Sequence, residues 1–144
     1  MVKVKQQLIS SLGLWHTGIL LVRVMTGLII LHYGLELFNP DKMTGYQQWL
    51  TDIHFPVPFL MAWLGKATEL AGGGLLMIGL FTRFVSIPLI ITMGVVTFIM
   101  GKGNIFADEQ LPFLLLLLCF VFLSTGAGIW SLDYLFFHKK RNGL

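Results

Sequence analysis

The sequence predicts an all-α integral membrane protein, a bundle of four antiparallel transmembrane helices preceded by a short amphipathic helix at the membrane interface. Of the 144 residues, 56% are hydrophobic and only 12% are charged, whereas a soluble domain of this size needs far more polar surface. Four apolar segments approach the roughly 20 helical residues that cross a bilayer. The basic residues flank these segments instead of forming a stripe, which indicates membrane topology and argues against nucleic-acid binding.

The elements follow one another along a single domain, residues 1–144. Residues 2–15 are expected to form the amphipathic helix on the membrane surface. Only "FTR" separates the second and third apolar segments, so these two helices are expected to form a tight antiparallel hairpin. The predicted spans are 17–38, 58–80, 84–100 and 111–130.

The distribution of basic residues predicts the orientation. Four spans place both termini on one side, together with six of the eight basic residues that lie outside the spans, while Lys42 and Lys102 fall on the other side. Both termini are therefore expected in the cytoplasm, with the protein in the cell inner membrane and loops 39–57 and 101–110 facing outward. The six are Lys3, Lys5, Arg83, Lys139, Lys140 and Arg141.

Two ionisable residues lie inside the second predicted span. Lys66 and Glu69 are expected roughly 12 and 16 Å from its outer end. Each costs about 2.5–3.5 kcal/mol if it faces lipid alone, and their i, i+3 spacing lets them pair inside the bundle. The glycines that follow admit a neighbouring helix, and they are Gly72, Gly73 and Gly74, with Gly79 as a further packing glycine. The pair is interpreted either as a candidate ligand or proton site, or as a structural ion pair beside a tight helix crossing.

The first span has one face made thin by glycine. Arg23, Gly27 and Gly34 share this face, so another helix can pack there. Arg23 is expected to pair with Asp133, just beyond the fourth span, and Arg83 competes for the same carboxylate. These three residues form a candidate structural ion cluster at the cytoplasmic edge.

His32 and Glu36 fall almost opposite Arg23 around the first helix. His32 is interpreted as a hydrogen-bonded packing residue or as part of the candidate site, and Glu36 as a group near the outer end that water reaches. Polar residues of the outer loops form either a mouth above Lys66 and Glu69 or a solvated rim. They are Asp41, Tyr46, Trp49, Asp52, His54, Asp108, Glu109 and Gln110.

Several chemistries lack a signature. No HExxH motif or cysteine cluster indicates a metal site, and His32 is the only histidine within a span, which argues against bis-histidine haem. The single cysteine, Cys119, excludes an intramolecular disulfide.

The motifs "RVMTG", "YGLELF", "GKATELAGGGLLMIGLFTR" and "GAGIWSLD" together resemble the DoxX family over residues 18–133. Many DoxX-like chains carry a lysine where this chain has Leu37, so a role of that lysine is either absent here or transferred to Lys66. The recurring family positions fall on Arg23, Gly34, Glu69, Gly72 or Gly73, Gly79, Arg83, Gly126, Gly128 and Asp133.

The resemblance implies a four-helix membrane protein, and together with the ionisable residues inside the spans it leaves three functions open. Relatives include a subunit linked to thiosulfate:quinone oxidoreductase and proteins associated with oxidative stress. The first hypothesis is therefore an accessory, non-catalytic subunit of a quinone-linked or oxidative-stress-related redox system. A quinone would be its cofactor, and a membrane redox subunit or a second copy of the chain its partner. The second is a membrane scaffold or assembly factor, and the third a small-solute or proton-coupled permease.

Overall fold

The computed structural model describes the chain except residues 1, 102, 104, 107 and 139–144, and it describes no side chain within 2–14 and 136–138. The described residues contain helices and no strand, which confirms the all-α prediction. In chain order the elements are α1 (Val2–Gly34), the 3-10 turn η1 (Leu35–Phe38), α2 (Pro40–Asp52), α3 (Pro58–Ile78), α4 (Thr82–Gly94), the π-helical segment η2 (Val95–Met100), α5 (Gln110–Thr125) and α6 (Leu132–His138).

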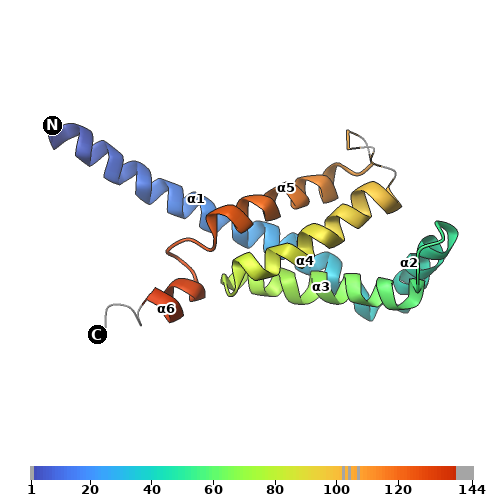
Figure 1. Cartoon of the computed structure of the whole chain (residues 1–144). Coiled ribbons are helices and arrows are strands. Elements are labelled where there is room, and N and C mark those ends of the chain that lie inside the picture. The colour runs from blue at the N-terminus through green and yellow to red at the C-terminus, as the bar shows by residue number, and fades with distance from the viewer. Residues whose placement is uncertain (1, 102, 104, 107, 139–144) are drawn as a thin grey trace.

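The helices pack in a simple order (Figure 1). The C-terminal half of α1 lies along α3, α3 pairs with α4, and α4 pairs with α5. The start of α1 and helix α6 lie at one end of the molecule, and α2 lies at the opposite end against α3. Below, the former is called the inner end and the latter the outer end.

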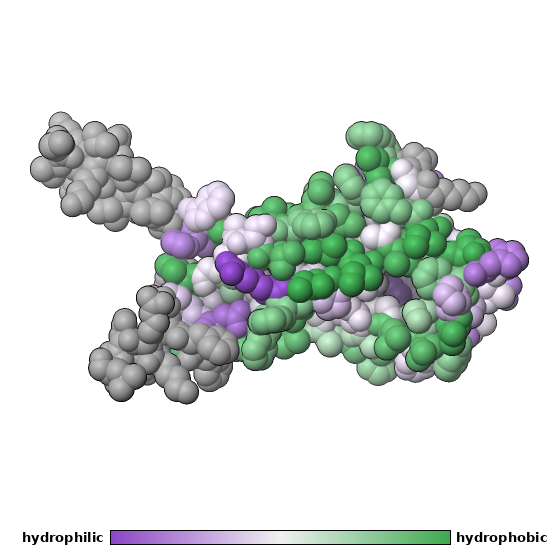
Figure 2. Space-filling model, viewed as in Figure 1, coloured by the Kyte–Doolittle hydropathy of each residue, from purple (hydrophilic) through white to green (hydrophobic). Residues whose placement is uncertain are grey.

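Two described stretches are long and apolar enough to cross a membrane, Trp15–Phe38 and Thr82–Met100. Only 28% and 33% of their apolar windows are buried inside the protein, so most of their surface is free to contact lipid. Figure 2 shows hydrophobic residues over most of the face formed by α4 and α5. Helix α5 has 16 residues and α3 carries charges, so the predicted count of four spans stays a prediction.

The two ends of the chain differ from the sequence-based expectation in detail. Helix α1 runs without a break from Val2 into the first span, so residues 2–14 are not a separate helix. Their side chains lie outside the described residues, and the amphipathic character stays a prediction. The segment 39–57, expected as a loop, contains the 13-residue helix α2. Asn39 starts α2 by accepting the N–H groups of Asp41 and Lys42, and Pro40 occupies the first helical position.

Helices α1 and α3 cross at backbone contact. A Cβ atom on Gly27 would lie 2.8 Å from the carbonyl oxygen of Gly73, and one on Gly34 would lie 2.5 Å from the Cα atom of Leu70. Any side chain at these positions would separate the helices. The glycine face of the first span therefore packs as predicted, and its partner is α3.

Gly72 faces the other side of α3. A Cβ atom there would lie 2.9 Å from the side chain of Leu89 in α4. Two glycines one residue apart thus bring α3 close to both of its neighbours.

Candidate functional site

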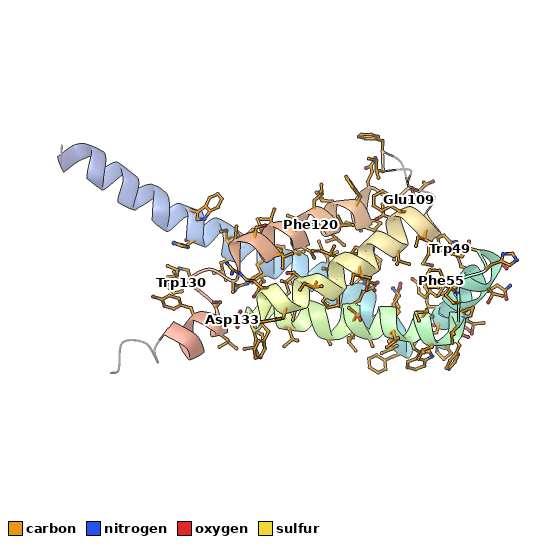
Figure 3. All side chains as sticks on the ribbon, in the orientation of Figure 1. Trp49, Phe55, Glu109, Phe120, Trp130 and Asp133 are labelled. Carbon is orange, nitrogen blue, oxygen red and sulfur yellow. The ribbon has the colours of Figure 1, made fainter. Side chains whose placement is uncertain are left out.

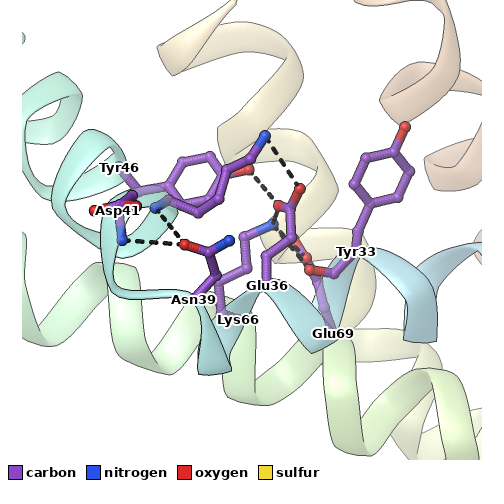
Figure 4. Close-up of polar contacts among 8 residues, drawn as sticks. Tyr33, Glu36, Asn39, Asp41, Tyr46, Lys66 and Glu69 are labelled. Atoms are coloured by element: carbon purple, nitrogen blue, oxygen red, sulfur yellow. Dashed lines mark hydrogen bonds and ion pairs between the residues drawn. The ribbon is translucent and has the colours of Figure 1, made fainter.

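A cluster of charged side chains lies at the outer end, centred on Lys66 (Figure 4). The Nζ atom of Lys66 lies 2.9 Å from Oε2 of Glu69 and 3.1 Å from Oε2 of Glu36. Lys66 is 8% exposed and Glu69 is 3% exposed. The contact between Lys66 and Glu69 that the i, i+3 spacing predicts is thus confirmed. Buried charges of this kind persist only with well-placed partners.

Glu36 reaches Lys66 because α1 tightens at its C-terminal end. After Gly34 the helix continues as the 3-10 turn η1, which carries Glu36. The close approach of Gly34 to the backbone of Leu70 and Glu69 holds this turn against α3. The structure therefore brings Glu36, Lys66 and Glu69 together from two helices.

Two tyrosines enclose the ammonium group. Lys66 Nζ lies 4.4 Å from the ring centroid of Tyr46 and 5.8 Å from that of Tyr33, distances at which an aromatic face attracts a cation. The Tyr46 hydroxyl donates a 2.5 Å hydrogen bond to Oε2 of Glu36. Burial raises the pKa of Tyr46, and the hydrogen bond to the Glu36 carboxylate raises it further. Tyr46 comes from α2, so this unexpected helix completes the cluster.

The cluster holds two carboxylates around one buried ammonium. Lys42 lies 3.6 Å from Oε1 of Glu36, but its side chain is 58% exposed, so this outer pair is weak. Lys66 also donates to the carbonyl of Tyr33 over 3.4 Å. These contacts engage all three N–H groups of Lys66, so it can donate to a ligand only in exchange for one of them, and the 3.4 Å contact with Tyr33 is the longest. Lys66 can also exchange a proton with Glu36 or Glu69.

Lys66, Glu69 and Asp108 are the charged residues that line a cavity of about 530 Å³ with mainly apolar walls. This volume falls within the range of small-molecule sites. The walls come from α1 through α5, and Figure 3 shows Trp49 and Phe55 projecting between α2 and the outer end of α4. The aromatic residues of the wall are Tyr33, Tyr46, Trp49 and Phe55.

One wall of the cavity departs from regular α-helix. Beyond Gly94 the helix continues as η2, a π-helical turn whose residues Val95, Val96 and Met100 line the cavity. Pro88, which has no backbone N–H, lies inside α4 and also lines it. Single π-helical turns are rare and frequently occur at functional sites.

The loop between α2 and α3 is strained next to the same cavity. His54 and Val57 have φ angles of 55° and 49°, a region that is costly for residues with a Cβ and most of all for a β-branched one. Between them Phe55 contributes to the cavity wall. The strained residues on either side of Phe55 indicate that the loop holds Phe55 in a fixed position in the cavity wall.

His32 is not part of the cluster. Its side chain is exposed on α1, and its ring contacts Tyr33 edge to face at 5.9 Å. The structure therefore separates His32 from Lys66, Glu69 and Glu36. A role for it in a ligand site stays a prediction.

Arg23 binds backbone carbonyls at the inner end. It is 1% exposed and donates to the carbonyl of Ala127 and, over 2.8 Å, to that of Trp130. Gly79, with φ of 69°, leaves room for the guanidinium, since a Cβ atom there would lie 2.8 Å from Cζ of Arg23. Arg23 thus ties α1 to the segment after α5, as a clamp would.

Asp133 has different partners from those expected. Its carboxylate accepts the N–H groups of Phe81 over 2.7 Å and Thr82 over 3.0 Å, and so caps the start of α4. Arg83 donates to the carbonyl of Ser124 over 3.4 Å. Arg23, Arg83 and Asp133 therefore share the inner end, but the described ion pairs do not join them.

Sequence reasoning missed Thr68 and Tyr33. Both line the cavity, and no described residue forms a hydrogen bond with the Thr68 hydroxyl. Thr68 lies two residues after Lys66, about 200° around the helix, so helical spacing does not place it beside Lys66. Tyr33 acts partly through its carbonyl, which no sequence pattern reveals.

Metal chemistry receives no support from the described part of the chain. It contains no group of three or more His, Cys, Asp or Glu side chains placed to hold a metal ion. Cys119 is a free thiol, buried in α5.

Comparison with known proteins gives one family and two relatives. The DoxX family model matches residues 18–102. A Bacillus subtilis (strain 168) protein named "Putative oxidoreductase CatD" is 35% identical over 127 residues, which cover 88% of this chain and 92% of the relative. An uncharacterized protein of Haemophilus influenzae is 33% identical over 124 residues, covering 81% of this chain and 87% of the relative. No solved structure matches the chain significantly.

Proposed function

Since the chain belongs to the DoxX family of membrane proteins, we propose that it is an accessory subunit of a quinone-linked or oxidative-stress-related membrane redox system. The name of the Bacillus relative, an oxidoreductase, supports a redox context. The observation that carries the proposal is the apolar cavity of about 530 Å³ with the Lys66 cluster at its polar end. Its partner is a membrane redox subunit, or a second copy of the chain.

The proposal includes a topology for the single domain 1–144. The chain crosses the inner membrane four times, as a bundle of α1, α3, α4 with η2, and α5, and both termini are cytoplasmic. The close crossings of α3 with α1 and α4 support such a bundle. Labelling single cysteines introduced in a Cys119→Ser background tests the topology. We expect an impermeant maleimide to label position 45 from outside, and position 142, in the C-terminal tail beyond the last span, only after permeabilisation; the reverse pattern contradicts it.

The residues of the cavity fit a quinone ring. A quinone presents two carbonyl oxygens on a flat apolar ring, so it needs hydrogen-bond donors and apolar or aromatic walls. The Thr68 hydroxyl, which forms no hydrogen bond within the described part of the chain, is such a donor, and Lys66 becomes one when it gives up its 3.4 Å contact with Tyr33. Tyr46, Trp49 and Phe55 supply aromatic surface. When bound, a quinone supplies two-electron, two-proton carrier chemistry.

Each side chain of the cluster has a different role in binding such a ring. Lys66 donates a hydrogen bond to the ring in exchange for its longest contact, the 3.4 Å bond to the carbonyl of Tyr33, while Glu69, its nearest carboxylate, continues to balance its charge. Glu36 is the more exposed of the two carboxylates, at 22% against 4% of the side chain, so it connects the cluster to water. Protons can pass between water and the cavity through Glu36, Lys66 and Glu69. The apolar walls exclude bulk water from the ring.

Quinone content of the protein purified in its own lipids tests this proposal. We expect about one quinone per chain in the wild type and in Lys42→Met. We expect at least about a tenfold lower ratio in the double variant Lys66→Met/Glu69→Leu, since tenfold corresponds to about 1.4 kcal/mol. The double variant removes both buried charges and so keeps the fold. A wild type without quinone, or a double variant with an unchanged ratio, contradicts the proposal.

A scaffold or assembly function is the second candidate, and the inner end favours it. There Arg23 and Asp133 tie α1, α4 and the segment after α5 together through backbone groups. If the protein is only a scaffold, cellular function follows protein abundance in every variant. Loss of function in Lys66→Met/Glu69→Leu at unchanged abundance would exclude it.

A further inference from the structure

We propose that the ligand of the cavity enters from the lipid, through a lateral opening between α3 and α4, and that its apolar tail remains in this opening. The lateral opening is defined by Leu64, Gly65 and Thr68 of α3 and Pro88, Ile91 and Thr92 of α4. This inference rests on the proposed function and adds the route and the class of ligand, an amphiphile with a polar ring and an apolar tail.

Helices α3 and α4 diverge from their hairpin toward the outer end (Figure 1). Close to the hairpin, a Cβ atom on Gly72 would lie only 2.9 Å from the side chain of Leu89. Two turns further on, a Cβ atom on Gly65 would find its nearest neighbour, the Thr92 methyl group, at 3.8 Å. The contact between the helices thus loosens where both contribute to the cavity.

The rim of the lateral opening faces outward. Leu64 and Ile91 both line the cavity, yet they are 51% and 62% exposed. A residue that lines a cavity and is also exposed lies at its mouth. The cavity is therefore open at the side of the molecule, between two helices, as well as near α2.

The depth of the lateral opening in the membrane indicates whether its ligand comes from lipid or from water. Ile91 is the middle residue of the apolar stretch Thr82–Met100, about 14 Å from either end at 1.5 Å per residue. A mouth at this position meets the centre of a hydrocarbon layer that is about 30 Å thick. Molecules present there are lipid-soluble, so a water-soluble ligand would not use this route.

The cavity has a polar end and an apolar end, as an amphiphile with a polar ring and an apolar tail does. Lys66 and Glu69 are buried in the lining of the cavity, whereas Leu64 and Ile91 at the rim are exposed, and Thr68 adds a hydroxyl to the lining. Leu64, Pro88 and Ile91 offer only apolar surface. A polar ring therefore fits at Lys66, with an apolar tail leading outward between the helices.

Tail-dependent binding tests this inference. The probes are a naphthoquinone with a long prenyl tail and the same ring with a methyl group in place of the tail, each titrated into purified protein in nanodiscs and followed by quenching of tryptophan fluorescence. Gly65→Phe and Ile91→Trp fill the lateral opening from its two walls. Gly74→Phe is the matched control, because Gly74 lies on the opposite side of α3, where a Cβ atom would meet only Leu31, at 3.9 Å.

We expect Gly65→Phe and Ile91→Trp to weaken binding of the tailed probe at least about tenfold, about 1.4 kcal/mol, and of the tail-less probe less than about twofold. Gly74→Phe should leave both unchanged. Equal effects on the two probes, or no effect from either wall, would overturn the lateral opening while leaving a quinone site intact. A wild type that binds neither probe would overturn the proposed function as well. If Gly65→Phe does not fold, Ile91→Trp alone tests the lateral opening, because it replaces no glycine.

Discussion

Replacement of Lys66 by methionine isolates the energetic role of the buried ammonium. The change keeps an unbranched apolar side chain but removes the charge that lies 2.9 Å from Glu69 and 3.1 Å from Glu36. Glu36 retains the Tyr46 hydroxyl and the nearby Lys42, whereas Glu69, 3% exposed, loses its partner. An uncompensated buried carboxylate of this kind costs about 3–5 kcal/mol.

We therefore expect Lys66→Met to lower the free energy of unfolding by about 3–5 kcal/mol. The double variant Lys66→Met/Glu69→Leu removes both charges, and we expect it to return to within about 1 kcal/mol of the wild type. Reversible unfolding of the purified protein in mixed micelles, followed by circular dichroism, measures both. Lys42→Met serves as the control and should change the value by less than about 1 kcal/mol, because its pair with Glu36 is exposed. A single variant as stable as the double variant would refute the reasoning.

Three further changes test the helix crossing, the cap and the tyrosine. Gly34→Leu places a side chain against the α3 backbone, and we expect it to lower the free energy of unfolding by about 3 kcal/mol in the same assay. An unchanged free energy of unfolding would show that α1 and α3 do not meet at Gly34. Asp133→Ala removes the acceptor of the N–H groups of Phe81 and Thr82 at the start of α4. We expect it to cost about 1–2 kcal/mol and to speed amide exchange at both residues, and unchanged exchange would disprove the cap. The pKa of Tyr46 is raised in the folded protein, so the stability that this shift contributes is fully present below about pH 10, the value for an unfolded tyrosine, and is lost as pH rises through the higher folded value. Over that pH range the wild type should lose stability more steeply than Tyr46→Phe. Parallel stability profiles of the two proteins would contradict this role of Tyr46.

The features predicted correctly from the sequence are those set by helical periodicity. Lys66 and Glu69 meet because residues three apart share a helix face. Gly27 and Gly34 form a thin face for the same reason, and α3 packs on it. The apolar, all-helical character follows from composition. None of these requires knowledge of contacts between distant segments.

The features that the sequence interpretation missed depend on long-range contacts or on backbone groups. The sequence predicts that Arg23 pairs with the opposite charge of Asp133, whereas in the structure Arg23 binds carbonyls more than 100 residues away. Carbonyls occur at every position, so the sequence does not single these two out. Helix α2 was missed within 39–57 although Asn39 and Pro40 form a recognisable start signal. Without α2 there was no means of placing Tyr46 on Lys66, so the enclosure of the ammonium could not be predicted.

The side-chain nitrogen resonance of Lys66 tests the central claim most directly. The protein is labelled with ¹⁵N-lysine in nanodiscs, the Lys66 signal is assigned by its absence from Lys66→Arg, and the tail-less naphthoquinone is titrated in. We expect the Lys66 signal to shift in proportion to the bound fraction while the exposed Lys42 signal stays in place, because Lys66 lies at the polar end of the cavity and Lys42 outside it. A quinone that binds, as judged by fluorescence quenching, without moving the Lys66 signal would contradict the claim that this cluster holds the ring.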